Sequence, residues 1–201
     1  MSICWITALL SYSYSKDVIL ISKSVGKTFE DNWKKSVPED ILIYRPPDAA
    51  QSFNQTSALR FSQKSPCDFF MFNGEYLFCI ELKTVAGNSI SFERDKNDKG
   101  VIHCYQIDSL KKLSKYKNVI SGLVIDFRKT ENTYFVNIKD WDRLIGDINK
   151  KSFNESDLIK FRSLIYINKK KLKVNYRYDV DNFIKNAISE ANRRDWLWVL
   201  K

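Results

Sequence analysis

Two apolar runs flank Asn73-Gly74 and dominate the pattern of hydrophobic and polar positions along the chain. An Asn-Gly pair between such runs is typical of a two-residue type I′ hairpin, because both turn residues need positive φ. The pattern therefore predicts antiparallel strands over Asp68–Phe72 and Glu75–Lys83. In the register that this turn imposes, Asp68 lies opposite Cys79.

The predicted hairpin has one polar and one apolar face, because side chains alternate along a strand. Asp68, Glu81 and Lys83 share a face, and Glu81 is the diagonal neighbour of Asp68, about 7–8 Å away. Two carboxylates at that distance can both reach one Mg²⁺ ion, whose ligands lie at about 2.0–2.1 Å. A solvated charged rim on an edge strand is the alternative, and slippage by one residue would separate the acids. The apolar face consists of Phe69, Met71, Tyr76, Phe78, Ile80 and Leu82.

Helices and strands alternate in the rest of the predicted chain. Phe29, Trp33 and Val37 form one apolar stripe of a helix that begins near Gly26 and ends before Pro38. The β-branched run Val119–Phe127 predicts a central strand that is buried on both faces, as in a sheet covered by helices. The other predicted elements are strands over Ile41–Tyr44 and Tyr134–Ile138, and helices over Tyr105–Tyr116, from Trp141, over Glu155–Ile165 and over 179–199. This order predicts an α/β fold with a central mixed β-sheet flanked by helices.

The length of 201 residues fits a single domain with a substantial core. We expect residues 1–25 to be an N-terminal extension and residues 26–201 to be the domain, with a helical C-terminal part. No run approaches the ~18 apolar residues of a membrane span. The 4 cysteines show no paired spacing and there is 1 histidine, which disfavours a zinc site and suggests reduced thiols in a cytoplasmic protein.

The chain is basic, with 33 Lys and Arg against 24 Asp and Glu and a net charge of +9. This excess favours a polyanionic partner, most simply nucleic acid, although basic proteins with other partners are common. Residues 48–66 form a long polar connection of the kind that is usually functional or mobile. The run at Lys169–Lys173 is either a solvated turn or a phosphate-binding patch. The candidate phosphate-contacting residues are Arg60, Lys64, Lys96, Lys169, Lys170 and Lys171.

The order of these segments resembles the core of the PD-(D/E)XK nucleases, and more closely the RecU-type Holliday junction resolvases and their phage relatives. The segments that carry the resemblance span about residues 26–138 and are Gly26–Glu30, Tyr44–Asp48, Asp68, Glu81-Leu82-Lys83, Ser89–Phe92, Tyr105–Ile107 and Gly122–Phe127. One departure is Pro66, where the RecU family has a threonine. The resemblance implies a restriction-endonuclease-like core and a homodimeric endonuclease, dependent on Mg²⁺ or Mn²⁺, that resolves Holliday junctions in recombination or repair.

The resemblance also implies roles for individual residues. Asp68 and Glu81 would be metal ligands and Gln106 would complete the metal site, while Lys83 would stabilise the transition state. Glu30 would be the acid on the first helix that supports the metal site or the scissile phosphate. By spacing alone, Gln106 and Glu30 could equally be surface residues. Two alternatives stay open, namely another nuclease of the superfamily, such as an exonuclease or restriction-like enzyme, and a non-catalytic DNA-binding factor on the same fold.

Overall fold

The central sheet of the protein is mixed. The computed structural model describes residues 24–47, 64–161 and 164–199. Within these ranges the sheet has the strand order β1 (Leu42–Tyr44), β2 (Phe69–Phe72), β3 (Leu77–Val85), β5 (Val119–Phe127), β6 (Asn132–Asn137) and β8 (Leu164–Tyr166). The central strands β3 and β5 are parallel and all other neighbours are antiparallel. This confirms the predicted α/β fold with a central mixed sheet.

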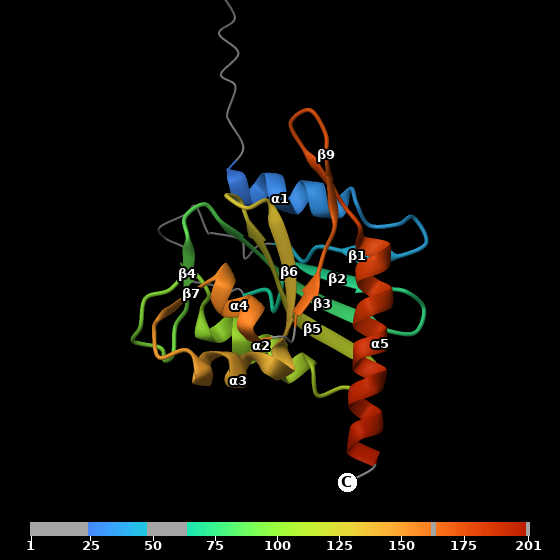
Figure 1. Cartoon of the computed structure of the whole chain (residues 1–201). Helices are drawn as coiled ribbons and strands as arrows, with labels where there is room; N and C mark the ends of the chain where they lie inside the picture. The colour runs from blue at the N-terminus through green and yellow to red at the C-terminus, as the bar shows by residue number, and fades with distance from the viewer. Residues whose placement is uncertain (1–23, 48–63, 162–163, 200–201) are drawn as a thin grey trace, which may run out of the picture.

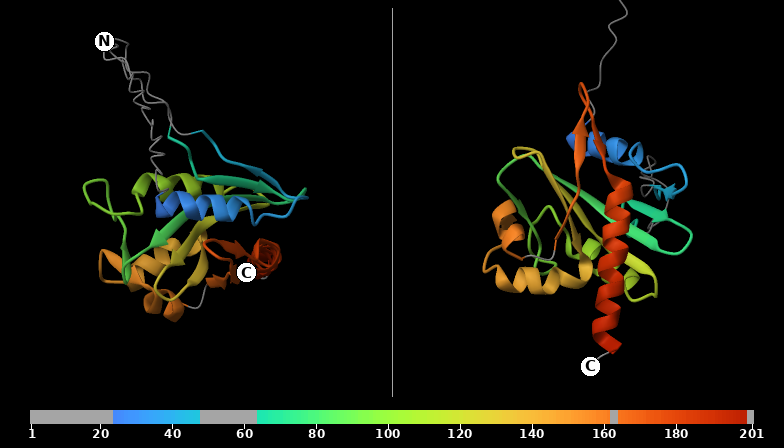
Figure 2. Two further views of the ribbon diagram at one scale, coloured as in Figure 1. Left: turned by 90° about the horizontal axis from the view of Figure 1, so that it is seen from above. Right: turned by 45° about the vertical axis from the view of Figure 1, so that its right-hand side comes forward.

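Helices cover both faces of the sheet (Figures 1 and 2). One face packs against α1 (Val25–Lys34) and α5 (Val180–Val199). The other face packs against α2 (Cys104–Leu113), α3 (Trp141–Asp147) and α4 (Glu155–Phe161). The remaining elements are a 3₁₀ turn (Ile138–Asp140) and the strand pairs β4 (Ser89–Ser91) with β7 (Ser152–Asn154), and β9 (Lys169–Lys171) with β10 (Tyr176–Tyr178). No helix in the described ranges has the length and apolarity to cross a bilayer.

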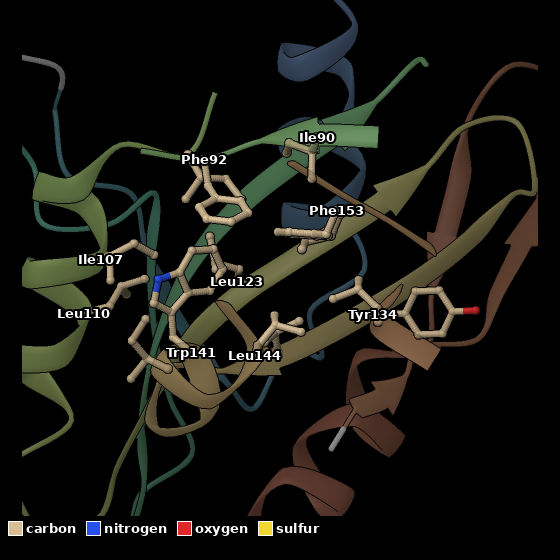
Figure 3. Close-up of a cluster of buried hydrophobic side chains, with 14 of the residues drawn as sticks. Ile90, Phe92, Ile107, Leu110, Leu123, Tyr134, Trp141, Leu144 and Phe153 are labelled. Carbon is tan, nitrogen blue, oxygen red and sulfur yellow. The ribbon is translucent and has the colours of Figure 1, made fainter. Parts of the chain in front are cut away.

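Each face of the sheet has its own aromatic core. On the side of α2 and α3, the Trp141 ring meets Phe92 edge to face with centroids 5.7 Å apart, as Figure 3 shows. On the side of α1 and α5, Trp33 packs against Phe183 with centroids 5.8 Å apart. Burying these rings removes large apolar areas from water and holds both helical layers on the sheet. The central strands β3 and β5 are therefore buried on both faces, as the sequence predicts for Val119–Phe127.

The turn between β2 and β3 differs from the predicted two-residue hairpin. Phe72 pairs with Leu77, so the loop holds the four residues 73–76. The Asn73 side-chain oxygen accepts hydrogen bonds from the backbone N–H groups of Glu75 and Tyr76 at 3.1 and 2.7 Å. In this loop Gly74 has positive φ (+94°) and Asn73 does not. The type I′ prediction is therefore wrong, because the Asn73 side chain closes the turn instead.

This longer loop shifts the register of β2 against β3 by two residues. Phe69, the first residue of β2, pairs with Ile80, whereas the predicted register pairs it with Phe78. Because side chains alternate with a period of two, a two-residue shift leaves every side chain on its predicted face. All six residues predicted for the apolar face accordingly pack in the core on the α1 side.

Downstream, one predicted helix boundary is wrong. The helix predicted over Glu155–Ile165 ends at Phe161, and Leu164–Tyr166 adds an antiparallel strand, β8, beside β6. The basic run forms strand β9 of a two-stranded ribbon. The predicted N-terminal extension and most of the connection over 48–66 lie outside the described residues.

Candidate active site

Strand β3 places Glu81 and Lys83 side by side on the face that packs against α2. Glu81 lies near the middle of the strand and is 4% exposed. Lys83 is two residues later and therefore points the same way. Its Nζ lies 3.0 Å from Glu81 Oε1, and its side chain is 12% exposed. This pair is thus largely withdrawn from water, with its ammonium group nearer to the surface than its carboxylate.

Asp68 approaches Glu81 from the start of β2. Its Oδ2 accepts a hydrogen bond from the backbone N–H of Leu82 at 2.7 Å. This bond ties the carboxylate to the strand that carries Glu81 and Lys83. Asp68, Glu81 and Lys83, which the sequence assigns to one polar face, are thereby brought together in one cluster.

The two carboxylates of the cluster resist ionisation. Burial, reinforced by the negative charge of Asp68, raises the pKa of Glu81 to about 7, and Lys83 opposes this rise. Burial also raises the pKa of Asp68, against the stabilising bond from Leu82 N–H and the charge of Lys83. Lys83 therefore serves two acids that are withdrawn from water, and Arg45 adds positive charge on the Asp68 side. A cation bound between the acids would offset the cost of ionising both.

Helix α1 contributes a third acid to this region. Glu30 Oε2 accepts from Arg45 Nε at 3.0 Å and from Lys27 Nζ at 3.2 Å. The charge of Glu30 helps to raise the pKa of both Asp68 and Glu81, so Glu30 lies toward the cluster and is not an isolated surface acid. Arg45 lowers the pKa of Asp68. Arg45 is thus a member of the site that the sequence pattern does not single out, although it stands in the Tyr44–Asp48 segment that carries the resemblance.

Gln106 reaches the cluster from the N-terminus of α2. Its Nε2 donates a hydrogen bond to Glu81 Oε1, and its Oε1 accepts from the backbone N–H of His103 at 3.0 Å. The predicted helix thus does aim Gln106 at the strand. With its oxygen bonded to the helix N-terminus, Gln106 serves Glu81 as a hydrogen-bond donor. To act as a metal ligand through that oxygen, as predicted, Gln106 would have to rotate its side-chain amide by about 180°.

Tyr105 and Lys64 lie beside the cluster. The Lys64 ammonium lies 4.1 Å from the centre of the Tyr105 ring, and the His103 ring stacks on Tyr105 with centroids 5.4 Å apart. Burial, together with the negative charges of Glu81 and Asp68, raises the pKa of Tyr105. Lys64, one of the predicted phosphate contacts, therefore lies against a tyrosine that is within electrostatic reach of both carboxylates.

The other predicted phosphate contacts are scattered. Arg60 lies outside the described residues, and Lys96 is exposed in the loop before α2. Lys170 and Lys171 are exposed on the β9–β10 ribbon. Lys169 is different, because it forms a buried ion pair with Asp126 in which both side chains are 5% exposed. The prediction that Lys169 contacts DNA conflicts with this burial.

The donor set fits a hard, oxygen-ligated cation. The described residues contain no group of three or more His, Cys, Asp and Glu side chains arranged around one point. Mg²⁺ needs no such cage, since proteins commonly hold it through one or two carboxylates while it keeps several waters. Asp68 and Glu81 satisfy that requirement, and because burial raises the pKa of both, a bound cation would favour their ionised forms. These two residues could therefore hold Mg²⁺ or Mn²⁺.

A scan against protein-family models finds no match for this chain. Among curated proteins, the SPbeta prophage-derived uncharacterized protein YotM of Bacillus subtilis (strain 168) is 31% identical over 182 residues, which cover 85% of this chain and 90% of YotM. The chain belongs to the YotM family. Among solved structures, this YotM-family chain is similar to Hjc, a Holliday junction resolvase of Archaeoglobus fulgidus, with a TM-score of 0.37 and 15% identity over 63% of this chain and 82% of Hjc.

Proposed function

We propose that this protein is a Mg²⁺-dependent DNA endonuclease of the PD-(D/E)XK type. The observation that carries the proposal is the cluster of Asp68, Glu81 and Lys83, in which two partly buried acids share one ammonium group. A purely structural pair would be charge-balanced, whereas this cluster gains from an added cation. The basic charge of +9 supports a polyanionic substrate.

The protein groups have distinct roles in this proposal. Asp68 and Glu81 would hold the cation, and a cation bound there would supply positive charge for the scissile phosphate and lower the pKa of a water molecule. Lys83 places a fixed ammonium next to Glu81, where it can stabilise negative charge that develops on the phosphate. The Gln106 amide and the Leu82 N–H each donate to one carboxylate and so fix its orientation.

The preferred substrate in this proposal is branched DNA, and the enzyme acts as a homodimer that resolves Holliday junctions in recombination or repair. The motif order shared with RecU-type resolvases supports this, including the segments around Glu30 and Gln106 that now lie next to Asp68 and Glu81. Two matched cuts are needed to resolve a four-way junction, which is the reason to expect two copies of the site.

The test is a cleavage assay on a four-way junction, a fork and a linear duplex, each with Mg²⁺ and with a chelator. We expect Mg²⁺-dependent cuts in the junction, and no cuts when Glu81→Gln replaces the wild type. Asp142→Asn is the matched control, because it neutralises an exposed acid on α3 that pairs with surface Lys111. Binding of all three DNAs without cleavage in any metal would instead support a non-catalytic DNA-binding factor, and full cleavage by Glu81→Gln would refute the proposed site.

A further inference from the structure

The ribbon of β9 and β10 projects past helix α1 at one end of the molecule (Figures 1 and 2). Its side chains alternate between two faces. Lys169 and Lys171 share one face, where Lys169 pairs with Asp126 and Lys171 with Glu131. Lys170 points to the other face, together with Arg177 of β10. Of the three consecutive lysines, Lys169 and Lys171 are therefore neutralised by acids and Lys170 is not.

The base of the ribbon is firmly attached. Lys169 is bonded to Asp126 and lies 3.1 Å from the hydroxyl of Thr133. Tyr178 is 4% exposed, and its ring packs against Phe29 and Trp33 of α1 with centroids 5.3 and 5.7 Å away. Buried polar groups that are fully paired hold an element in one arrangement. The ribbon should therefore keep a fixed direction relative to α1.

The outer face of the ribbon carries two unopposed positive charges. Lys170 and Arg177 are direct cross-strand partners and both are exposed. Neither forms an ion pair with any residue in the described part of the chain. Like charges directly opposite each other destabilise a strand pair, so this arrangement costs folding free energy. A polyanion such as a nucleic-acid backbone would remove the repulsion by binding both groups.

The tip of the ribbon carries two exposed apolar side chains, one on either side of Lys173 in the sequence. Leu172 is 42% exposed and Val174 is 84% exposed. The Leu172 N–H donates to the carbonyl of Asn175 at 2.7 Å, which closes a tight turn and holds both side chains outward. Apolar side chains on elements that enter DNA grooves can pack between unstacked base steps. Exposed apolar side chains next to a pair of cations are suited to contact a nucleic-acid base and the phosphates on either side of it.

Helix α1 connects the ribbon to the candidate active site. Phe29 packs against Tyr178 at the base of the ribbon, and the next residue, Glu30, lies toward Asp68 and Glu81. The ribbon and the carboxylate cluster thus flank the same turn of one helix.

We infer that the β9–β10 ribbon is a DNA-contacting prong that recognises branched or distorted DNA. Lys170 and Arg177 bind phosphates of a duplex arm, and Leu172 and Val174 pack against unpaired or unstacked bases at the branch point. The inference rests on the proposed function for its substrate, DNA, but not on cleavage. Lys170 and Arg177 would then account for the affinity for DNA, and Leu172 and Val174 for the preference for branched DNA over linear duplex.

The first test measures binding to a four-way junction and to a linear duplex by fluorescence anisotropy in a chelator at several salt concentrations. For Lys170→Ala/Arg177→Ala we expect binding about 10-fold weaker or more at low salt, and a salt slope smaller by about two, because two phosphate contacts are lost. Lys115→Ala/Lys117→Ala is the matched control, since it removes two exposed charges next to the other end of β5. Equal effects of the two double variants would overturn the cationic part of the inference.

The second test uses Leu172→Ser/Val174→Ser, which keeps every charge of the ribbon. We expect this variant to bind linear duplex like the wild type but to lose the preference for the junction. A 2-aminopurine base at the branch point should change its fluorescence on binding wild type and not on binding the variant. An unchanged preference together with an unchanged 2-aminopurine signal would overturn the role of the tip.

These tests separate the prong from the nuclease. If the protein never cleaves DNA but the ribbon variants bind as predicted, the DNA-contacting role of the ribbon is supported and the proposed nuclease activity is refuted. If the protein cleaves junctions and the ribbon variants bind and cleave like the wild type, the prong fails and the nuclease stands. Circular dichroism melting of each variant shows that it is folded, because all four substituted positions are exposed.

Discussion

Two buried carboxylate–lysine pairs lie on neighbouring strands and on opposite faces of the sheet. Glu81 of β3 pairs with Lys83 on the α2 side, and Asp126 of β5 pairs with Lys169 under the β9–β10 ribbon. Both carboxylates are almost fully buried, at 4% and 3% exposure. Burial of an acid beside a lysine therefore does not by itself distinguish a functional site from a structural one.

The two pairs differ in the balance of charge around them. Asp126 has Lys169 and the donating hydroxyl of Thr133, so one negative charge meets one positive charge and a hydrogen bond. Glu81 shares Lys83 with Asp68, whereas the nearby Glu30 has its own partners in Arg45 and Lys27. The first arrangement is complete as it stands, whereas the second gains from another cation. The unbalanced pair is the one that we assign to catalysis.

The largest expected difference between the pairs is in DNA cleavage. Glu81→Gln should reduce the rate by about 10²–10³-fold or more, because it removes a charge that holds the cation, while DNA binding survives. Asp126→Asn should leave the rate of the folded protein within a few-fold of wild type. Single-turnover cleavage of a junction measures both. A loss of similar size in Asp126→Asn at a temperature where it is folded would erase the proposed distinction.

The second difference concerns stability. Lys169→Met should lower the free energy of unfolding by about 3–5 kcal/mol, because it leaves the Asp126 carboxylate buried and unpaired. Lys83→Met should cost less, since Glu81 already has a pKa of about 7 and can take up a proton instead. Urea unfolding at pH 7 compares the two variants. Equal losses of unfolding free energy in the two variants would show that both carboxylates depend equally on their lysine partners.

A smaller effect is expected from pH. The pKa of Glu81 rises from its ordinary value of 4.5 to about 7 in the folded protein, so the folded state binds more protons between these values. The free energy of unfolding should then fall as pH rises through this window, by up to about 3 kcal/mol, with the stabilisation complete below pH 4.5 and lost above pH 7. Glu81→Gln should flatten this slope in metal-free buffer. Parallel curves for the two proteins between pH 4.5 and 7 would contradict the raised pKa.

Much of the site could be predicted because it depends on the alternation of side chains between the two faces of a strand. Glu81 and Lys83 must share a face at a spacing of two, and Asp68 keeps that face in either register. The register itself could not be predicted correctly, since it depends on the Asn73 side chain capping a four-residue loop. The structure therefore pairs Phe69 with Ile80 where the sequence predicts Phe78, and Asp68, which precedes β2, accepts a hydrogen bond from the N–H of Leu82.

The sequence could not predict side-chain partners that come from segments far apart in the chain. Nothing in the run at Lys169–Lys171 shows which lysine is buried, because the answer depends on Asp126 in β5. The partnership of Arg45 with Glu30 likewise joins the segment after β1 to α1. The orientation of Gln106 depends on a hydrogen bond to its own helix N-terminus, which the sequence pattern does not distinguish from metal ligation.

Metal binding tests the central distinction most directly. Electron paramagnetic resonance of Mn²⁺ titrated into the DNA-free protein measures occupancy without any requirement for activity. We predict saturable binding by wild type and by Asp126→Asn, and affinity weaker by about 10²-fold in Asp68→Asn and Glu81→Gln. Absence of saturable binding by the wild type, or equal binding by Glu81→Gln, would contradict the assignment of Asp68 and Glu81 as a cation site.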